Sequence, residues 1–341
     1  MSKHTLIVPQ VKRTYQQLYR MQRLPLIQKI PITMRRIVQW HTINKGMVYI
    51  SFSGGKDSTV LAELVWSIYP DLPAVFSNTT NEYPEIQKFV NKKIKEGKNI
   101  VIVKPDISFK KVIERFGWAV ISKTQAMAIS RYRNGDEDAK EYRMNGRINK
   151  DTGKKEKAGT ISKKHRYMID APFKISENCC EQLKKKPFKK YNKKTGRVPF
   201  TGEMASESMN REEEWIKSGC NAFDKKGLKS SPLSFWTEQD ILHFLKDYSV
   251  DYCSDLYGDI VESTDMFQLD FFKDQQNADL KCTGVSRSGC MFCMFGLELE
   301  TLANHGENRF TKMKKTHPKH HNAIINKLGA GKVLDFMKLP Y

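Results

Sequence analysis

The stretch from residue 47 to residue 68 constrains the fold of this chain more than any other. An apolar, β-favouring run over residues 47–52 ends in Ser53-Gly54-Gly55-Lys56-Asp57-Ser58, and a strong helix-forming sequence, residues 59–68, follows at once. Two adjacent glycines allow a tight turn and let the backbone approach a ligand closely. A strand, a glycine turn and a helix N-terminus in this order predict an anion site, because the first N–H groups of a helix lack internal acceptors.

The order of residues in this turn also narrows the kind of anion. We predict that the N–H groups of Asp57 and Ser58 face a phosphate, with Lys56 as a point charge beside it. A Walker A motif is excluded, since it needs a glycine where this chain has Ile50. The six residues resemble the pyrophosphate loop (PP-loop) of the adenine nucleotide α-hydrolase superfamily, whose members bind ATP or an adenylyl sulfate and act at the α-phosphate. The plain alternative is a glycine turn before an ordinary helix.

The PP-loop resemblance implies both binding and catalytic roles. The nucleotide-binding residues implied are Ser53, Gly54, Gly55, Lys56, Asp57 and Ser58. Catalytic roles are expected for Lys56, which would neutralise the phosphates, and for Asp57, which would help to place Mg²⁺. Ser58 and the loop N–H groups would hold the leaving pyrophosphate.

The flanking sequence predicts an α/β fold. Two further strands are expected at residues 74–77 and 99–103, and helices alternate with them, including one over residues 109–116 that ends at Gly117. This alternation favours a doubly wound, mainly parallel sheet, whose ligands lie at the carboxyl ends of its strands. Thr237 is expected to cap a structural helix that follows Trp236.

Two later stretches resemble the phosphoadenosine phosphosulfate reductase family. After the second strand, that family has Asp-Thr-Gly and then an aromatic–Pro–Glu; Thr79 and the run Tyr83-Pro84-Glu85 match, whereas Asn78 and Thr80 depart. Further on, the family has a strand ending in Gly, two arginines, a Ser and another Arg. The matching residues there are Gly202, Ser208 and Arg211. The resemblance implies that Asn78, Thr79, Gly202, Ser208 and Arg211 bind nucleotide.

The same comparison argues against a sulfonucleotide as the substrate. Met204 and Ala205 occupy the two arginine positions. In sulfonucleotide reductases such arginines hold sulfate or phosphate groups, so their replacement counts against that substrate. For Arg211 an alternative remains open, because a surface arginine at this position can pair with Glu207 one helical turn earlier.

All seven cysteines lie in the second half of the chain, at positions 179, 180, 220, 253, 282, 290 and 293. Clustering of this kind in a cytosolic chain indicates metal or redox chemistry. The adjacent pair Cys179 and Cys180, followed far along by Cys290 and Cys293, resembles the iron–sulfur adenylyl sulfate reductases, which implies a 4Fe–4S cluster on these four thiolates. The gap is longer than usual in that family, so Cys282 remains a substitute ligand. Zinc and a set of reduced buried thiols are the alternatives.

Three classes of function follow from these residues. The preferred one is an ATP pyrophosphatase-type enzyme that adenylates an acceptor for sulfur transfer. The runner-up is a reductase of adenylyl sulfate or of its 3′-phosphate; no cysteine follows Cys293, so such an enzyme would have to recruit Cys220 or Cys253 as its nucleophile. The third is a non-catalytic module that binds nucleotide and nucleic acid.

Charge and composition suggest the partners and the organisation. The formal net charge of +20 implies negatively charged binding partners, either nucleic acid or phosphorylated ligands. We expect a basic helical segment (residues 1–45), a PP-loop domain (46–240) and a helical C-terminal region (241–341). A basic insertion at about 133–197, a loop or at most a hairpin over 133–170, is the expected route to nucleic acid; a protein partner is also expected. No apolar run is long enough for a membrane span, and no signal peptide is recognisable, so a cytoplasmic location is expected.

Overall fold

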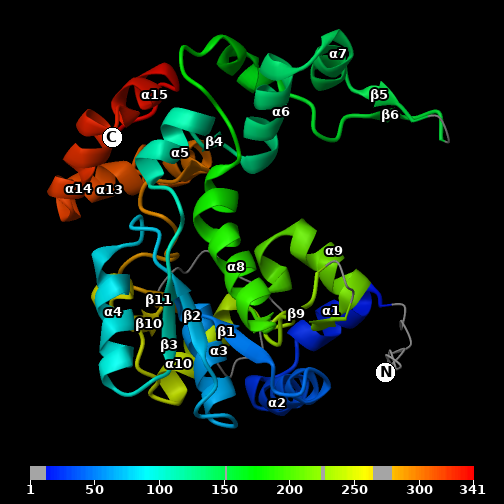
Figure 1. The fold of residues 1–341 in the computed structure, drawn as a ribbon, viewed down its shortest axis with the longest axis vertical. Helices are drawn as coiled ribbons and strands as arrows, with labels where there is room; N and C mark the ends of the chain where they lie inside the picture. The colour runs from blue at the N-terminus through cyan, green and yellow to red at the C-terminus, as the bar shows by residue number, and fades with distance from the viewer. Residues whose placement is uncertain (1–12, 150–151, 224–226, 264–278) are drawn as a thin grey trace. The chain divides into compact units, whose positions relative to one another are not determined.

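A computed structural model describes residues 13–149, 152–223, 227–263 and 279–341 (Figure 1). Residues 1–12 of the expected N-terminal segment and residues 150–151 of the expected insertion lie outside the described part. The described residues form two compact units. The first unit is drawn from 1–77, 83–103 and 190–288, and the second from 78–82, 104–189 and 289–341. In the described ranges, no helix combines the length and apolar character that crossing a membrane requires.

A six-stranded sheet forms the centre of the first unit (Figure 1). Its strands are β1 (Val48–Ser51), β2 (Ala74–Ser77), β3 (Ile100–Val103), β7 (Val198–Phe200), β8 (Asn221–Ala222) and β9 (Lys229–Ser230). The order is β3-β2-β1-β7-β9-β8, and every pair is parallel except β8 with β9. The predicted α/β class with a mainly parallel sheet is therefore confirmed. The chain runs outward from β1 to β3 and then returns to β7 on the other side of β1, which creates a switch point between β1 and β7.

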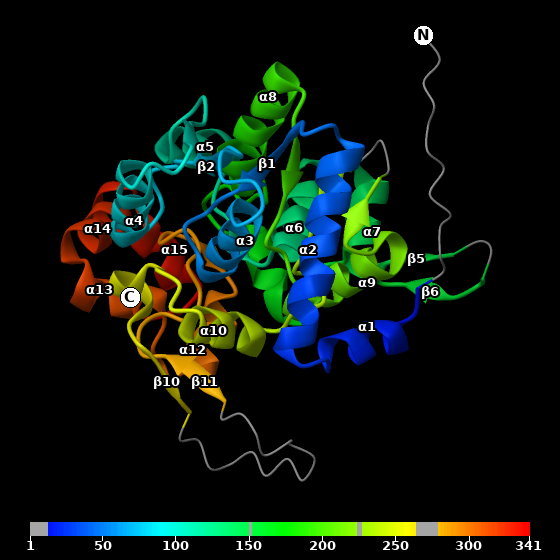
Figure 2. The ribbon, with the colours of Figure 1, turned by 90° about the horizontal axis from the view of Figure 1, so that it is seen from below.

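Helices complete the first unit, and Figure 2 shows α1 and α2 in blue. They are α1 (Tyr15–Gln22), α2 (Leu26–Ile43), α3 (Lys56–Trp66), α4 (Pro84–Lys95), the 3-10 turn η3 (Ala205–Glu207), α9 (Met209–Ser218), α10 (Glu238–Asp247) and α11 (Ser254–Tyr257). A hairpin of β10 (Ile260–Glu262) and β11 (Leu280–Cys282) follows α11. The predicted cap at Thr237 is confirmed, since its side chain accepts the N–H of Asp240. Helix α4 begins at Pro84, as N-terminal prolines favour.

A buried ion pair ties helix α2 to helix α10. The ammonium of Lys29 lies 2.6 Å from the carboxylate of Asp240, and both residues are buried. The same carboxylate accepts the backbone N–H of Thr237 at 2.6 Å. Trp236 is fully buried and donates its indole N–H to Thr33 of α2 at 2.8 Å. This stretch is structural, as its capping pattern predicts.

The second unit is mainly helical. Its elements up to residue 189 are α5 (Phe109–Phe116), β4 (Val120–Ile121), α6 (Lys123–Asn134), α7 (Glu137–Asn145), the hairpin β5 (Arg147–Ile148) and β6 (Lys155–Glu156), the 3-10 helix η1 (Lys163–Asp170), the π-helix η2 (Glu181–Lys185) and the start of α8 (Lys186–Thr195). The stretch 133–170 was expected to be a loop or a hairpin, but it also contains α7. Asp136 caps that helix by accepting the N–H of Ala139.

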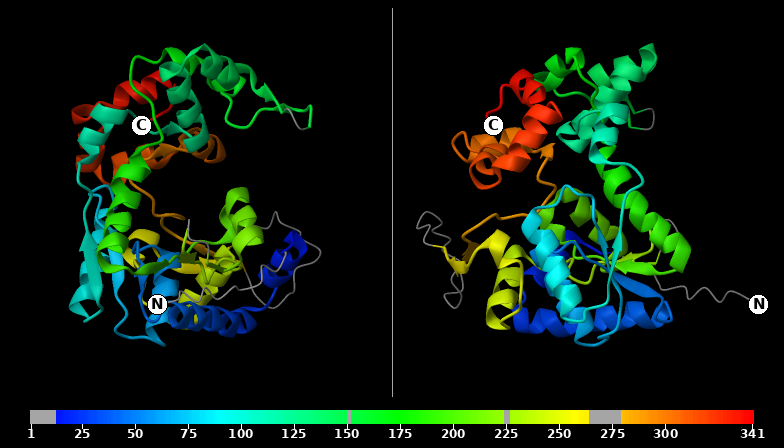
Figure 3. Two further views of the ribbon diagram at one scale, coloured as in Figure 1. Left: turned by 45° about the vertical axis from the view of Figure 1, so that its right-hand side comes forward. Right: turned by 60° about the vertical axis from the view of Figure 1, so that its left-hand side comes forward.

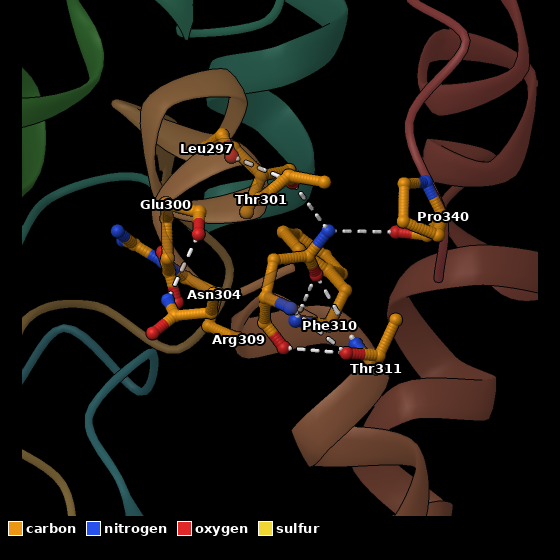
Figure 4. A network of polar contacts seen from close by, with 9 residues as sticks. Leu297, Glu300, Thr301, Asn304, Arg309, Phe310, Thr311 and Pro340 are labelled. Atoms are coloured by element: carbon orange, nitrogen blue, oxygen red, sulfur yellow. Dashed lines mark hydrogen bonds and ion pairs between the residues drawn. The ribbon is translucent and has the colours of Figure 1, made fainter. Parts of the chain in front are cut away.

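The last part of the chain gathers into a group of short helices, drawn in orange and red in Figure 3. They follow β12 (Met294–Phe295) and are α12 (Leu297–Ala303), α13 (Arg309–Thr316), α14 (Pro318–Asn322), the π-helix η4 (Ala323–Lys327) and α15 (Ala330–Phe336). Asn308 is fully buried and connects three of their segments. Figure 4 shows the polar contacts of this region, among them those of Thr301, Thr311 and Pro340. The amide of Asn308 donates to Thr301 at 3.0 Å and to the carbonyl of Pro340 at 2.9 Å, while the side-chain oxygen of Asn308 caps α13.

Candidate nucleotide site and cysteine cavity

The PP-loop occupies the turn between β1 and α3, as its sequence predicts. Gly55 is the N-cap residue of α3, and Gly54 has φ +71°, a conformation that favours glycine. A Cβ at Gly54 would lie 3.0 Å from the side chain of Ile86. The first helical N–H with an internal acceptor is that of Thr59, which donates to Gly55 at 2.9 Å. The N–H groups before it are those that a phosphate can use.

Hydrogen bonds between Ser53 and Ser58 connect the two ends of the loop. The hydroxyl of Ser58 accepts the backbone N–H of Ser53 at 3.1 Å, lies 2.9 Å from the Ser53 hydroxyl and donates to the carbonyl of Gly55 at 2.9 Å. Ser58 is buried, whereas Ser53 is exposed. These contacts fix the shape of the loop with side chains of the loop itself.

Gly202 brings the end of β7 against the start of α3. A Cβ at Gly202 would lie 3.1 Å from the carbonyl carbon of Asp57 and 3.2 Å from the backbone nitrogen of Ser58. A larger residue would therefore push the β7 loop away from the N–H groups of the PP-loop. This contact lies at the switch point between β1 and β7, where doubly wound sheets bind their ligands.

Lys56 is almost completely buried, with 5% of its surface exposed. Its ammonium lies 3.0 Å from the carboxylate of Glu238, 3.8 Å from the thiol of Cys282 and 5.3 Å from the centre of the Tyr257 ring. The sequence contained only a weak signal for Glu238, as the first residue of a capped helix, and none for the roles of Cys282 and Tyr257 here.

A tyrosine–serine pair closes one side of the loop. The hydroxyl of Tyr257 donates to the hydroxyl of Ser288. A Cβ at Gly55 would lie 3.0 Å from the Ser288 oxygen and 3.3 Å from the Tyr257 oxygen. The second glycine of the motif, Gly55, thus leaves the space that the side chains of Tyr257 and Ser288 occupy. Neither Tyr257 nor Ser288 is recognisable as a site residue from the sequence.

The carboxyl of Asp57 is in an environment that disfavours its charge. Burial raises the pKa of Asp57, and the charge of Glu238 raises it further, while Lys56 opposes both effects. A cation near this carboxyl would favour the ionised form again.

Arg211 and Ser208 lie on α9, near the β7 loop. Arg211 forms an ion pair with Glu207, one turn earlier on the chain, and a second one with Glu203 at 3.8 Å. The helical pairing foreseen as an alternative role for Arg211 is therefore present in the structure. Ser208 is the exposed N-cap residue of α9. Met204 and Ala205, at the two arginine positions of the resembling family, are buried.

Asn78 and Thr79 belong to the second unit, where their side chains are engaged locally. The N–H and the hydroxyl of Thr79 both donate to Glu82, at 3.0 and 2.6 Å. The side-chain oxygen of Asn78 accepts the N–H of Thr80 at 3.0 Å.

The sequence of the chain matches a model of a known protein family. The sequence model of the phosphoadenosine phosphosulfate reductase domain matches residues 47–133 and 129–293, which is well over half of the chain. The chain belongs to the phosphoadenosine phosphosulfate reductase family. No curated protein matches it. A solved structure that it resembles is the phosphate complex of phosphoadenylyl-sulfate reductase from Candida auris, at 12% identity and a TM-score of 0.36, over 72% of this chain and 92% of that one.

In this phosphoadenosine phosphosulfate reductase family member, four cysteines of the second unit line one cavity. Cys179, Cys180, Cys290 and Cys293 share it with apolar walls that include Trp118. The segment after α5 brings the two pairs together. Trp118 bridges to Ile175, shortly before the first pair, and β4 pairs in parallel with β12, directly after the second pair.

Gly117 makes the first of these contacts feasible. Its φ is +100°, and a Cβ there would lie 2.3 Å from the carbonyl carbon of Lys174. Only glycine allows the two backbones to approach so closely. The cavity therefore depends on a backbone contact as well as on its thiols.

Burial changes the protonation behaviour of the thiols in this cavity and of a neighbouring lysine. Burial raises the pKa of Cys290 to about 11 and also raises the pKa of Cys179 and of Cys293. The negative charge of the Cys290 thiolate in turn raises the pKa of Lys184. Across the described residues, no three His, Cys, Asp or Glu side chains form a group that could hold a metal ion.

Proposed function

We propose that this protein is a PP-loop enzyme that uses ATP to adenylate an acceptor, with release of pyrophosphate, in preparation for sulfur transfer. The observation that carries this proposal is the preformed loop, with the buried Lys56 at the N-terminus of α3 and Gly202 packed against it. The burial of Met204 and Ala205, where sulfonucleotide-binding relatives have arginines, favours ATP over a sulfonucleotide.

The loop residues account for the proposed chemistry. The free N–H groups of α3 and the Lys56 ammonium would bind the β- and γ-phosphates, and Lys56 would then exchange Glu238 for phosphate oxygens. An acceptor oxygen would attack the α-phosphorus, forming the new P–O bond while the bond to the β-phosphate oxygen breaks and pyrophosphate leaves. Asp57 would hold Mg²⁺, which supplies further neutralisation of the leaving group.

We also propose that Cys179, Cys180, Cys290 and Cys293 hold a 4Fe–4S cluster, which would have a structural or electrostatic role. The support is the shared cavity of the four thiols and the cation of Lys184 beside them. Free thiols of this kind fit a reducing compartment such as the cytoplasm. The acceptor that we propose is nucleic acid, because the chain carries a formal net charge of +20.

The position of Cys282 favours a second candidate, the reductase of adenylyl sulfate or of its 3′-phosphate. Its thiol lies 3.8 Å from the Lys56 ammonium, next to the loop that would hold the nucleotide. In such an enzyme the Cys282 thiolate would attack the sulfate sulfur and displace the nucleotide, forming an S-sulfocysteine. An added dithiol would then attack the cysteine sulfur, release sulfite and, by forming its own disulfide, restore the Cys282 thiol. Burial raises the pKa of Cys282, and Lys56 counteracts that rise.

The test is a calorimetric titration of the anaerobically purified protein with ATP, adenylyl sulfate and its 3′-phosphate, each with Mg²⁺. Tight ATP binding that Lys56→Ala abolishes, together with pyrophosphate release in the presence of RNA or DNA, supports adenylation. A preference for a sulfonucleotide, with sulfite formation that Cys282→Ser abolishes, supports the reductase instead. Binding of ATP without pyrophosphate release under any condition indicates a non-catalytic module.

A further inference from the structure

A large hollow lies between α1, α2 and the C-terminal end of α9, all within the first unit. Its volume is about 410 Å³, and it is open to solvent. Its lining includes three arginines, Arg13, Arg20 and Arg36. We refer to it as the arginine hollow. Neither the PP-loop nor the cysteine cavity contributes a residue to it.

The three arginines are free to bind an anion. None of them forms an ion pair with a carboxylate of the described residues, and the first acidic residue of the whole chain is Asp57. Helices α1 and α2 therefore bring positive charge to the hollow without compensating carboxylates of their own. Arginine recognises phosphate oxygens with two parallel N–H groups, which suits this arrangement.

Two of the arginines are held in place by their neighbours. The Arg13 guanidinium lies over Gly219, where an added Cβ would come within 2.6 Å of its Nε. Arg36 donates to the side chain of Gln39 at 3.2 Å, and Asn221 donates to the same oxygen at 3.2 Å. These contacts hold the groups in position before a ligand arrives, which reduces the entropy that binding costs.

Aromatic side chains complete the lining. Trp215 and Phe223 both border the hollow, and Trp215 is buried. The indole N–H of Trp215 is buried without a hydrogen-bond acceptor among the described residues. A buried donor without a partner is unfavourable, so a ligand that supplies an acceptor gains from pairing with it. Rings beside arginines are typical of sites for unpaired bases.

A second, smaller hollow links this region to the nucleotide loop. It shares Trp215, Gly219 and Cys220 with the arginine hollow and reaches Glu203 and Arg211. Glu203 directly follows Gly202, which packs on the PP-loop. The two hollows share three lining residues, so the arginine hollow lies beside the segment that leads to the PP-loop.

We propose that the arginine hollow binds the phosphate backbone of single-stranded nucleic acid and places that strand as the acceptor. The role of the strand as the acceptor rests on the proposed function, whereas the binding of the strand to the hollow does not. A concave hollow with aromatic walls admits single phosphates and an unpaired base, while a duplex keeps its bases stacked inside. The side-chain amides of Gln17 and Gln39 also line the hollow and offer N–H donors to a base edge.

The experiment measures fluorescence anisotropy of a labelled single-stranded RNA, with the full chain purified anaerobically and the salt concentration varied. Matched single-stranded DNA, duplex RNA and inorganic phosphate serve as competitors. The test variant is Arg13→Ala/Arg20→Ala/Arg36→Ala. The control is Lys154→Ala/Lys155→Ala/Lys157→Ala, which removes the same charge from the basic insertion. Loss of three phosphate contacts is expected to weaken binding by at least about tenfold and to lower the salt slope by about 2, while the control changes binding little.

Several outcomes overturn the proposal. They are unchanged binding by the arginine variant, an equal or larger loss in the lysine control, and a preference for the duplex or for free phosphate. If the triple variant fails to fold, the exposed pair Arg20→Ala/Arg36→Ala replaces it, and a smaller loss of the same sign is required. ATP titration of each variant separates the two ideas. If the strand binds but no pyrophosphate is released, the proposed function is contradicted and the binding role of the hollow is not. If pyrophosphate is released but no strand binds, the binding role of the hollow is contradicted and the proposed function is not.

Discussion

The ammonium group of Lys56 lies 3.0 Å from the carboxylate of Glu238, although the two residues are 182 positions apart in the sequence. The lysine is buried and half of the glutamate side chain is exposed. Glu238 therefore places a negative charge at the same ammonium group that a phosphate would contact. A carboxylate that competes with the ligand for the same cation weakens ligand binding.

We predict that Glu238→Gln tightens ATP binding severalfold, because the amide leaves the Lys56 charge available. Titration calorimetry with Mg²⁺ measures the effect. Glu213→Gln, an exposed residue of α9 that pairs with Lys217, is the matched control and should change nothing. A weaker affinity in Glu238→Gln would show that the carboxylate itself assists the nucleotide or its metal ion.

Asp57→Asn should stabilise the free protein at neutral pH and abolish the Mg²⁺ dependence of nucleotide binding. A carboxyl whose pKa is raised by folding costs stability above its unfolded pKa, and the cost is complete above its folded pKa. The gain from the amide should therefore be largest at pH 7–8 and vanish toward pH 4. Chemical unfolding at several pH values checks this, with exposed Asp71→Asn as the control. A gain independent of pH would exclude the titration of Asp57 as its cause.

Gly117→Ala should destabilise the second unit by about 1–3 kcal/mol or more and lower its iron content. The added methyl group would overlap the Lys174 carbonyl, and the backbone conformation itself disfavours alanine. Gly289→Ala is the control, since nothing lies within 4 Å of the position of its Cβ. Thermal unfolding and iron analysis of both variants provide the comparison. Equal stability of the two variants would contradict the close approach of the backbones.

Single replacements of Cys179, Cys180, Cys290 or Cys293 by alanine should remove iron and the visible absorbance of the anaerobically purified protein. Cys220→Ala and Cys253→Ala, which change buried thiols of the first unit, should leave both intact. Cys282→Ala decides whether that residue is a ligand, and its position beside Lys56 predicts that it is not. Stoichiometric zinc in place of iron would refute the cluster.

Asn308→Ala should cost about 2–4 kcal/mol, because it removes a helix cap and leaves two partly buried acceptors without their donor. Asn308→Asp keeps the cap and loses the amide donors, so its cost should be intermediate. The exposed Asn326→Ala serves as the control. Urea unfolding ranks the three variants, and any other order would contradict the network in Figure 4.

Much of the nucleotide site could be predicted because its determinants are local. The strand, the two glycines and the start of α3 follow one another within a few residues, and sterics and helix-end hydrogen bonding dictate their geometry. The cap at Thr237 and the helix end at Gly117 are local in the same sense. The α/β class and the family were predictable for this reason. The proposed roles of the site residues, the cluster and the acceptor remain predictions.

The tertiary structure decided which distant groups meet. Glu238, Cys282 and Tyr257 reach Lys56 only because α10, β11 and α11 fold back on the loop, and no short-range pattern encodes that return. Packing of β4 against β12 brings residues 104–189 into one unit with residues 289–341, although more than a hundred residues separate the paired strands. The arginine hollow arises in the same way, from side chains of α1, α2 and α9. Such contacts depend on the burial of whole faces of helices and sheets. Many residues together determine that burial, and no single short motif does.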